Sequence, residues 1–183
     1  LGPRHEELTT ICEGLRRVFV ALKQSFEVIF VDDCAGPSTR QQLRLVAARV
    51  PEARVIRLQR QMGEATALAI GAQSAHGQIV VTVDPYLHVS LEDLPKLLEP
   101  LRNGADVVCA WRSPRLERGL SRLASNAFNG AARWLTGVSV HDLNCRTRAM
   151  RRKVLEDVPV YGDLHRFLPI FAARRGFFSA SQK

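Results

Sequence analysis

Hydrophobic and polar positions follow two different periods along the first 110 residues. Short apolar runs at 26–31, 53–58, 78–84 and 105–110 predict buried β-strands. Between them, apolar positions recur every three or four residues, which predicts helices at 8–22, 38–50, 63–75 and 90–103, the second of them capped by Ser38. Strands that alternate with helices are typical of βαβ units. We therefore expect an α/β, Rossmann-like fold with a mostly parallel sheet flanked by helices.

The last third of the chain has a different pattern. Apolar residues from Leu120 to Leu135 form one long helical stripe that ends before Gly137. Residues 142–150 are expected to be irregular or a short strand, residues 151–157 a short helix, and residues 164–172 a final apolar face. No apolar segment approaches the roughly 18 residues that a membrane-spanning helix needs. A single domain over residues 1–183 accounts for this pattern.

Charge divides the chain into two parts. Residues 1–111 carry 12 Lys and Arg against 13 Asp and Glu, a net charge of −1, whereas residues 112–183 carry 14 against 5, a net charge of +9. Such a basic half suits phosphate, an anionic membrane surface or nucleic acid, or it is a solvated surface that keeps the protein soluble. The four cysteines have no C-x-x-C spacing, which argues against a zinc or disulfide scaffold and favours reduced thiols.

Carboxylates follow two of the predicted strands directly. Asp32 and Asp33 follow the run 26–31, and Asp84 ends the run 78–84. Ligands of open α/β sheets bind at the carboxyl ends of the strands, so these side chains are candidates for ligand contact. The alternative is structural, because an aspartate after a strand also forms turns or caps a helix.

Six motifs in sequence order extend this interpretation. They are Val31-Asp32-Asp33; Arg60-Gln61-Met62-Gly63 with the small residues that follow it; Asp84; the arginine-rich stretch 112–121 followed by Asn126 and Asn129; Thr136-Gly137 with residues 142–148; and His165-Arg166-Phe167-Leu168-Pro169. Together they resemble the GT-A glycosyltransferases of family 2, especially the dolichyl- and polyprenyl-phosphate sugar synthases. The resemblance covers nearly the whole chain.

For residues 1–111, the resemblance implies the binding of a nucleotide-diphosphate sugar, either a UDP-sugar or a GDP-sugar. The donor-binding residues that it implies are Asp32, Asp33, Gln61, Gly63 and Asp84. Asp84 would hold Mg²⁺ or Mn²⁺, which assists a leaving diphosphate as a Lewis acid. Tyr86 replaces the second acid of the family's D-x-D, and tyrosine is a poorer ligand for these hard cations. Three alternatives follow: His88 compensates as a nitrogen ligand, the metal binds weakly, or it does not bind. For His88 itself, the other interpretation is an exposed loop histidine.

For the basic half, the resemblance implies contact with the phosphate of a polyprenyl lipid. The acceptor-phosphate residues that it implies are Arg112, Arg115, Ser121, Arg122, His165 and Arg166. Guanidinium groups offer a bidentate fork to phosphate oxygens, although a solvated helical face also explains Arg115 and Arg122. Asp142 is the implied catalytic residue, as general base or charge stabiliser. The alternative for Asp142 is a loop carboxylate that pairs with Arg146 or Arg148.

The leading hypothesis is therefore an enzyme, a family 2 hexosyltransferase that moves a sugar from a nucleotide-diphosphate donor to a polyprenyl phosphate with inversion. We expect it in the cytoplasm, as a peripheral protein at the cytoplasmic face of a membrane, with a homo-oligomer as an open possibility. Tyr86 and the apparent lack of the family's opening strand motivate a second hypothesis, a non-catalytic scaffold or regulator that binds nucleotide or lipid phosphate. We expect no nucleic-acid partner. Basic charge is the only feature that favours one, and the aromatic platforms typical of nucleic-acid-binding domains are missing from the sequence.

Overall fold

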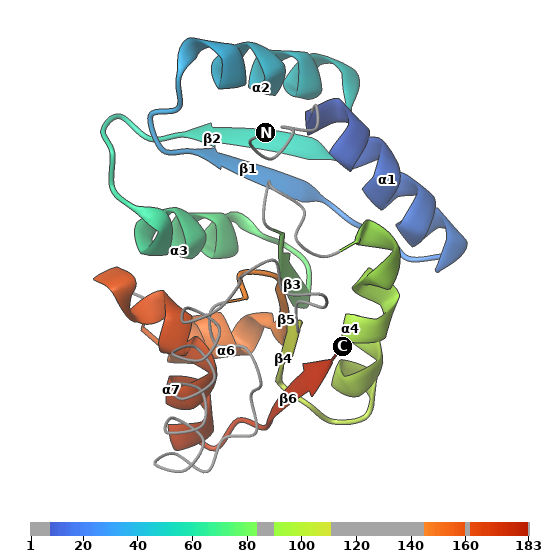
Figure 1. Cartoon of the computed structure of the whole chain (residues 1–183), viewed down its shortest axis with the longest axis vertical. Helices are drawn as coiled ribbons and strands as arrows, with labels where there is room; N and C mark the ends of the chain where they lie inside the picture. Colours follow the sequence, from blue (N-terminus) through green and yellow to red (C-terminus); the bar gives the residue numbers. More distant parts are fainter. Residues whose placement is uncertain (1–7, 84–89, 111–144, 160–161, 183) are drawn as a thin grey trace, which may run out of the picture.

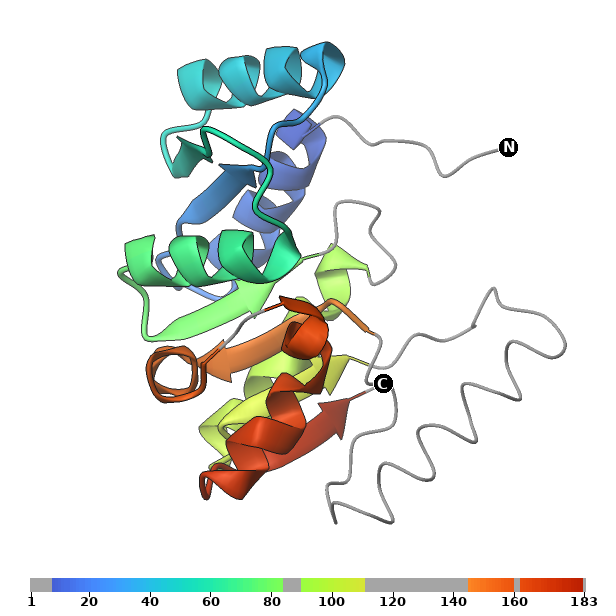
Figure 2. The ribbon, with the colours of Figure 1, turned by 90° about the vertical axis from the view of Figure 1, so that its left-hand side faces the viewer.

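The computed structural model describes residues 8–83, 90–110, 145–159 and 162–182 (Figures 1 and 2). Its helices are α1 (Leu8–Ala21), α2 (Pro37–Arg49), α3 (Glu64–Ser74), α4 (Leu94–Arg102), α6 (Arg152–Asp157) and α7 (Leu168–Arg174), with 3-10 helices η1 (Leu91–Asp93) and η2 (Gly162–Phe167). Its strands are β1 (Val28–Asp32), β2 (Ala53–Arg57), β3 (Ile79–Thr82), β4 (Val107–Ala110), β5 (Arg148–Arg151) and β6 (Ser179–Gln182).

These strands form two sheets. β1 pairs in parallel with β2, and the other four strands lie in the order β3-β5-β4-β6. β4 and β6 are parallel, whereas β5 is antiparallel to both of its neighbours. The α/β fold class is confirmed, but the sheet that contains β5 is mixed rather than mostly parallel. The sequence of β5, Arg-Ala-Met-Arg, has no apolar run from which its direction could be predicted.

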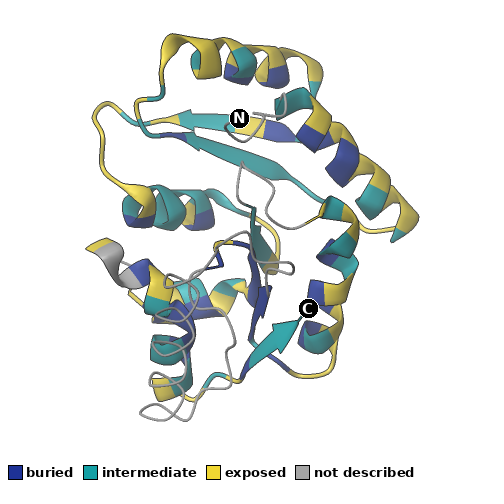
Figure 3. Cartoon of the chain, in the orientation of Figure 1, coloured by how far each residue is buried: buried dark blue, intermediate teal, exposed yellow. Residues whose placement is uncertain are grey.

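The four-stranded sheet lies between helices on both faces. Successive residues of a strand point to opposite faces. Val108 and Ala149 accordingly belong to the core cluster with α4, while Val107 and Met150 belong to the cluster with α6 and α7. Figure 3 shows β4 and β5 as buried throughout most of their length. This sheet is therefore the centre of the larger hydrophobic core.

The sheet of β1 and β2 packs differently. α1 and α2 contribute Cys12 and Val46 to a cluster with Ala53, Val28 and Phe30. α3 approaches β1 closely, since a Cβ atom on Gly71 would lie 3.3 Å from the Cγ2 atom of Val31. The alanine- and glycine-rich sequence of α3 permits this approach.

Among the described residues, β1 and β3 each have an edge without a β-partner, so no ladder of backbone hydrogen bonds joins the two sheets. Most residues of these two strands are only partly buried, in contrast to β4 (Figure 3). The connection between the sheets therefore depends on helices and on polar side chains.

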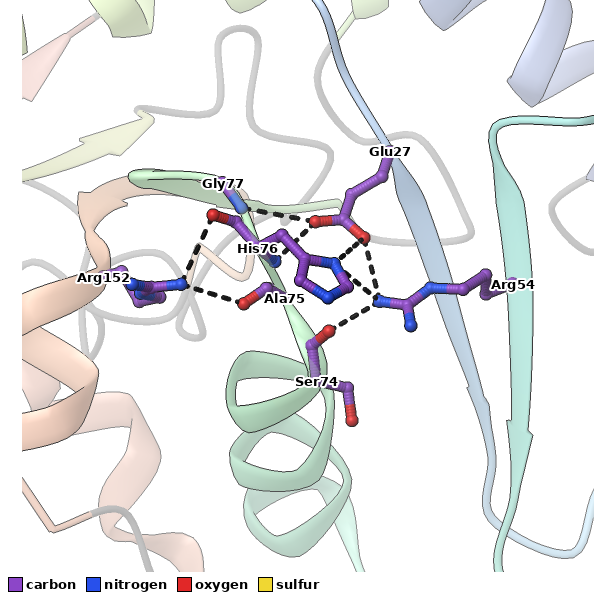
Figure 4. A network of polar contacts seen from close by, with 7 residues as sticks. All are labelled: Glu27, Arg54, Ser74, Ala75, His76, Gly77 and Arg152. Atoms are coloured by element: carbon purple, nitrogen blue, oxygen red, sulfur yellow. Dashed lines mark hydrogen bonds and ion pairs between the residues drawn. The ribbon is translucent and has the colours of Figure 1, made fainter.

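One polar connection is the Glu27 network, which consists of Glu27, Arg54, Arg152 and the backbone of residues 74–77 (Figure 4). The Glu27 carboxylate accepts hydrogen bonds from the amides of His76 (2.6 Å) and Gly77 (3.3 Å). It also pairs with the guanidinium of Arg54 at 2.9 Å, and Arg54 donates to the Ser74 carbonyl at 2.5 Å.

The same network reaches the four-stranded sheet through Arg152, at the start of α6. Its guanidinium donates to the carbonyls of Ala75 (3.1 Å) and His76 (3.3 Å), as Figure 4 shows. The backbone between α3 and β3 is thus held by Glu27 from one sheet and by Arg152 beside the other.

Most predicted elements in the described residues are confirmed, usually within two residues of the predicted ends. Ser38 as the cap of α2 is wrong: Gly36 is the N-cap without a side-chain hydrogen bond, and Pro37 opens the helix, a position where its missing N–H is not needed. β6 was not predicted, because Ser-Ala-Ser-Gln lacks the β-branched and aromatic residues typical of strands. No described helix is long and apolar enough to cross a membrane. The predicted helix at 120–135 lies outside the described residues.

We expect Glu27→Ala to lower the free energy of unfolding by about 1–3 kcal/mol, because it removes a charged acceptor from two backbone amides and from Arg54. Urea denaturation at neutral pH measures this loss. Glu52→Ala is the matched control, since Glu52 is as exposed as Glu27 and makes a similar ion pair with Arg16. Its loss should cost less, because Glu27 also holds the amides of His76 and Gly77.

The pH dependence of stability tests the same network. Burial raises the pKa of Glu27, but hydrogen bonds from the His76 and Gly77 amides and from Arg54 outweigh it, so the pKa lies below its ordinary value of 4.5. The stabilisation from Glu27 is therefore complete above pH 4.5 and disappears as the pH falls through the lower folded-state value. Glu27→Gln should lose less stability over this acidic interval than the wild type. Equal losses would contradict the network's role.

Candidate active site

Asp32 lies at the carboxyl end of β1 with only 1% of its side chain exposed. Its Oδ1 atom accepts from the Ala35 amide at 2.7 Å and its Oδ2 atom from Nε of Arg57 at 3.2 Å. Burial raises the pKa of Asp32, but these two donors outweigh burial and place it below the ordinary value. The carboxylate is therefore ionised and contacts protein groups, as the turn-forming alternative expects. Contact of Asp32 with the donor stays a prediction.

Asp33 holds the loop that precedes α3. Its two carboxylate oxygens accept from the amides of Met62 (2.6 Å) and Gly63 (2.8 Å). Gly63 has φ of +86°, a conformation that favours glycine because it has no Cβ. Asp33 thereby fixes the point at which α3 begins, with Glu64 as the first helical residue. The positive end of the helix macrodipole lies at this point.

Glu64 connects α3 to two basic side chains from distant segments. One carboxylate oxygen lies 3.3 Å from Nη2 of Arg146, and the other lies 3.5 Å from Nε2 of His165. The Nδ1 atom of His165 lies 3.2 Å from the Gly162 carbonyl oxygen. Both ring nitrogens thus lie near oxygen atoms of other residues, which fixes the orientation of the ring.

Arg148 fixes the backbone of the segment that carries His165 and Arg166. This arginine is buried, with 5% of its surface exposed. Its guanidinium donates to the carbonyls of Cys145 (3.0 Å), His165 (2.8 Å) and Arg166 (3.1 Å). The end of η2 is therefore held beside the start of β5 by a single side chain.

Thr82, the last residue of β3, extends this arrangement to the strand that leads towards Asp84. Its hydroxyl accepts from the Arg148 amide at 3.1 Å and donates to the Arg146 carbonyl at 2.6 Å. The end of β3 is thus connected to the residues that precede and begin β5.

A cavity of about 230 Å³ lies between the start of α3 and η2. It is lined by Met62, Gly63, Glu64, Ala65, Gly162, His165 and Arg166. Gly63 was predicted to bind the donor, and His165 and Arg166 the acceptor phosphate. Gly63 is about a hundred positions away from His165 and Arg166 in the sequence, and the structure brings all three to one cavity. Gln61 lies exposed in the adjoining loop.

Several predicted site residues lie outside the described residues: Asp84, His88, Arg112, Arg115, Ser121, Arg122 and Asp142. Sequence reasoning missed the contacts of Glu64, Thr82 and Arg148. Glu64 was not among the predicted site residues, because no spacing in the sequence indicates a contact with residue 165. The partner found for Arg146 is Glu64, whereas the proposed pairing with Asp142 stays untested.

The described residues contain no group of three or more His, Cys, Asp or Glu side chains that could hold a metal ion. They do not by themselves provide a ligand set for Mg²⁺ or Mn²⁺, and the predicted ligands Asp84 and His88 belong to the remainder of the chain.

The arrangement of sheets and helices is shared with solved structures. Mycobacterium tuberculosis glucosyl-3-phosphoglycerate synthase superposes with a TM-score of 0.67 at 21% identity, over 98% of this chain and 69% of that chain. Its complex with Mn²⁺, UDP and glucosyl-3-phosphoglycerate gives a TM-score of 0.61 at 19% identity, over 98% and 67%. At these identities the likeness shows the fold alone, and that fold is the GT-A glycosyltransferase fold.

The family follows from the sequence match. The model of glycosyl transferase family 2 matches residues 3–159, and the chain belongs to this family. The undecaprenyl-phosphate 4-deoxy-4-formamido-L-arabinose transferase of Pseudomonas aeruginosa is 33% identical over 174 residues, 93% of this chain and 51% of the relative.

A second relative points to the same group of enzymes. The dodecaprenyl-phosphate galacturonate synthase of Rhizobium johnstonii is 29% identical over 166 residues, 89% of this chain and 49% of the relative. The resemblance to polyprenyl-phosphate sugar synthases is thus confirmed. The chain spans about half the length of these curated relatives.

We expect Arg148→Met to lower the free energy of unfolding by about 2–4 kcal/mol, because buried carbonyl groups lose their donor. Arg148→Lys should cost less but should still move the NMR signals of the His165 ring, since lysine cannot reproduce the fork. The matched control is Arg151→Lys on the same strand, where the arginine donates to Leu101 and pairs with Asp106. Unchanged His165 signals in Arg148→Lys would show that Arg148 does not position η2.

Proposed function

We propose that the protein transfers a glycosyl group from a nucleotide-diphosphate sugar to a polyprenyl phosphate. The observation that carries the proposal is the cavity at which the loop held by Asp33 meets His165 and Arg166. Membership of glycosyl transferase family 2 and the names of the two curated relatives support the same reaction class.

The donor would lie at the carboxyl ends of β1 and β3, where open α/β sheets bind their ligands. On this proposal, Asp33 shapes the site by fixing the Met62 and Gly63 amides, and Gln61 is exposed beside them. Asp84, two residues beyond the end of β3, would approach the diphosphate. A Mg²⁺ or Mn²⁺ ion bound there would supply Lewis-acid help to the leaving group.

The acceptor phosphate would bind beside η2. His165 and Arg166 line the cavity, Arg146 lies next to it through Glu64, and charge-assisted hydrogen bonds from such groups are strong. Arg112, Arg115, Ser121 and Arg122 are proposed to extend this site. The net charge of +9 on residues 112–183 suits peripheral contact with an anionic membrane surface, proposed at the cytoplasmic face, where the lipid acceptor is anchored.

The reaction is a single displacement. A phosphate oxygen of the acceptor forms a bond to the anomeric carbon while the bond from that carbon to the nucleotide diphosphate breaks, so the configuration inverts. The nucleotide diphosphate leaves with the bonding electron pair. The phosphate is already nucleophilic at neutral pH, so the protein contributes mainly by positioning it. Asp142 is proposed to stabilise charge or to accept a proton. The names of the relatives do not favour the non-catalytic alternative.

We expect the full-length protein to transfer radiolabel from a UDP- or GDP-sugar to undecaprenyl phosphate in detergent micelles. Arg166→Ala should raise KM for the lipid phosphate about tenfold or more and leave KM for the donor nearly unchanged, because it removes a charged contact with the acceptor alone. Extraction of labelled lipid measures the transfer.

Arg174→Ala is the matched control, since Arg174 is an exposed arginine at the end of α7 and does not line the cavity. No labelled lipid from any donor of the panel, with or without Mn²⁺, would contradict the proposed function.

A further inference from the structure

We propose that Glu64 competes with the acceptor phosphate for Arg146 and His165. Its carboxylate lies between these two side chains, at the position that we infer for a phosphate group of the acceptor. The inference rests on the proposed function, because it assumes that the acceptor phosphate binds beside His165 and Arg166.

The geometry of the carboxylate supports this role. Glu64 lines the cavity. One of its carboxylate oxygens lies 3.3 Å from Arg146, and the other lies 3.5 Å from His165. A phosphate group offers pairs of oxygens to neighbouring cations in the same manner and carries more negative charge. The two anions therefore compete for one pair of side chains.

The burial of the three side chains decides which of them can move. The side chain of His165 is only 10% exposed and is also held by the Gly162 carbonyl, whereas the side chains of Glu64 and Arg146 are 44% and 49% exposed. Half-exposed ion pairs contribute little to stability, so the Glu64 carboxylate can turn into solvent at a small cost. Arg146 then remains available to the incoming phosphate.

The charge at the cavity also changes during the reaction. The acceptor is a phosphate monoester with nearly two negative charges at neutral pH, and transfer of the sugar converts it to a diester with one. Arg146 and His165 hold the diester less strongly than the monoester, while the competing Glu64 carboxylate keeps its charge. Glu64 is thus able to return to Arg146 and His165 once the product has formed, which lowers the affinity for the product.

The test uses inorganic phosphate as the probe and isothermal titration calorimetry of the full-length protein at neutral pH. Glu64→Gln should lower Kd for phosphate about threefold to tenfold, because it removes the competing charge and keeps the shape of the side chain. It should also lower KM for undecaprenyl phosphate and strengthen inhibition by the glycosylated lipid. Glu92→Gln, which makes the same charge change in η1, should leave these three quantities unchanged.

Two arms separate the inference from the proposed function. If Arg146→Gln and Arg166→Gln both weaken phosphate binding but Glu64→Gln leaves Kd unchanged or raises it, the competition by Glu64 is refuted while the acceptor site stands. If neither arginine variant alters phosphate binding, or if no variant binds phosphate, the acceptor site itself is refuted. If Glu64→Gln binds phosphate more tightly, and the gain disappears when Arg146→Gln is added, the inference is confirmed.

Discussion

The arrangement of the site depends on how α3 is held against β1. Glu27 and Asp33 lie directly before and after β1, and each accepts hydrogen bonds from two backbone amides. Glu27 accepts from residues 76 and 77, beyond the end of α3. Asp33 accepts from residues 62 and 63, before the start of α3. Between these ends, Gly71 allows α3 to approach Val31. Since the described strands of the two sheets share no hydrogen-bond ladder, the Glu27 network takes over part of that connection.

This constraint explains why the candidate site is assembled from distant segments. Once the start of α3 is fixed, Glu64 can reach Arg146 and His165, and Arg148 holds the backbone of η2 from the other side. Buried charged groups with several hydrogen bonds are costly to disrupt, so they define one geometry for the cavity. Glu64 on its wall and Arg146 beside it are half-exposed, and these two groups are the ones that can respond to a ligand.

Patterns within single segments were sufficient to predict most helices and strands, because the apolar runs of β1 and β4 and the stripes of α1 and α4 record which face is buried. The motif resemblance also predicted the family, and it selected Gly63, His165 and Arg166, which line one cavity. It could not predict that Asp33 would bind backbone amides or that Arg148 would bind carbonyls, because such contacts depend on how distant segments pack. The direction of β5 and the existence of β6 were missed because neither sequence has a strand-like pattern.

The Asp33 carboxylate holds the amides of Met62 and Gly63, and these two residues form one wall of the cavity. Amide hydrogen exchange, followed by NMR in the wild type and in Asp33→Ala, measures this directly. The account predicts that both amides are protected in the wild type and lose protection in the variant, while the His76 and Gly77 amides held by Glu27 stay protected. Unprotected Met62 and Gly63 amides in the wild type, or unchanged protection in the variant, would contradict it.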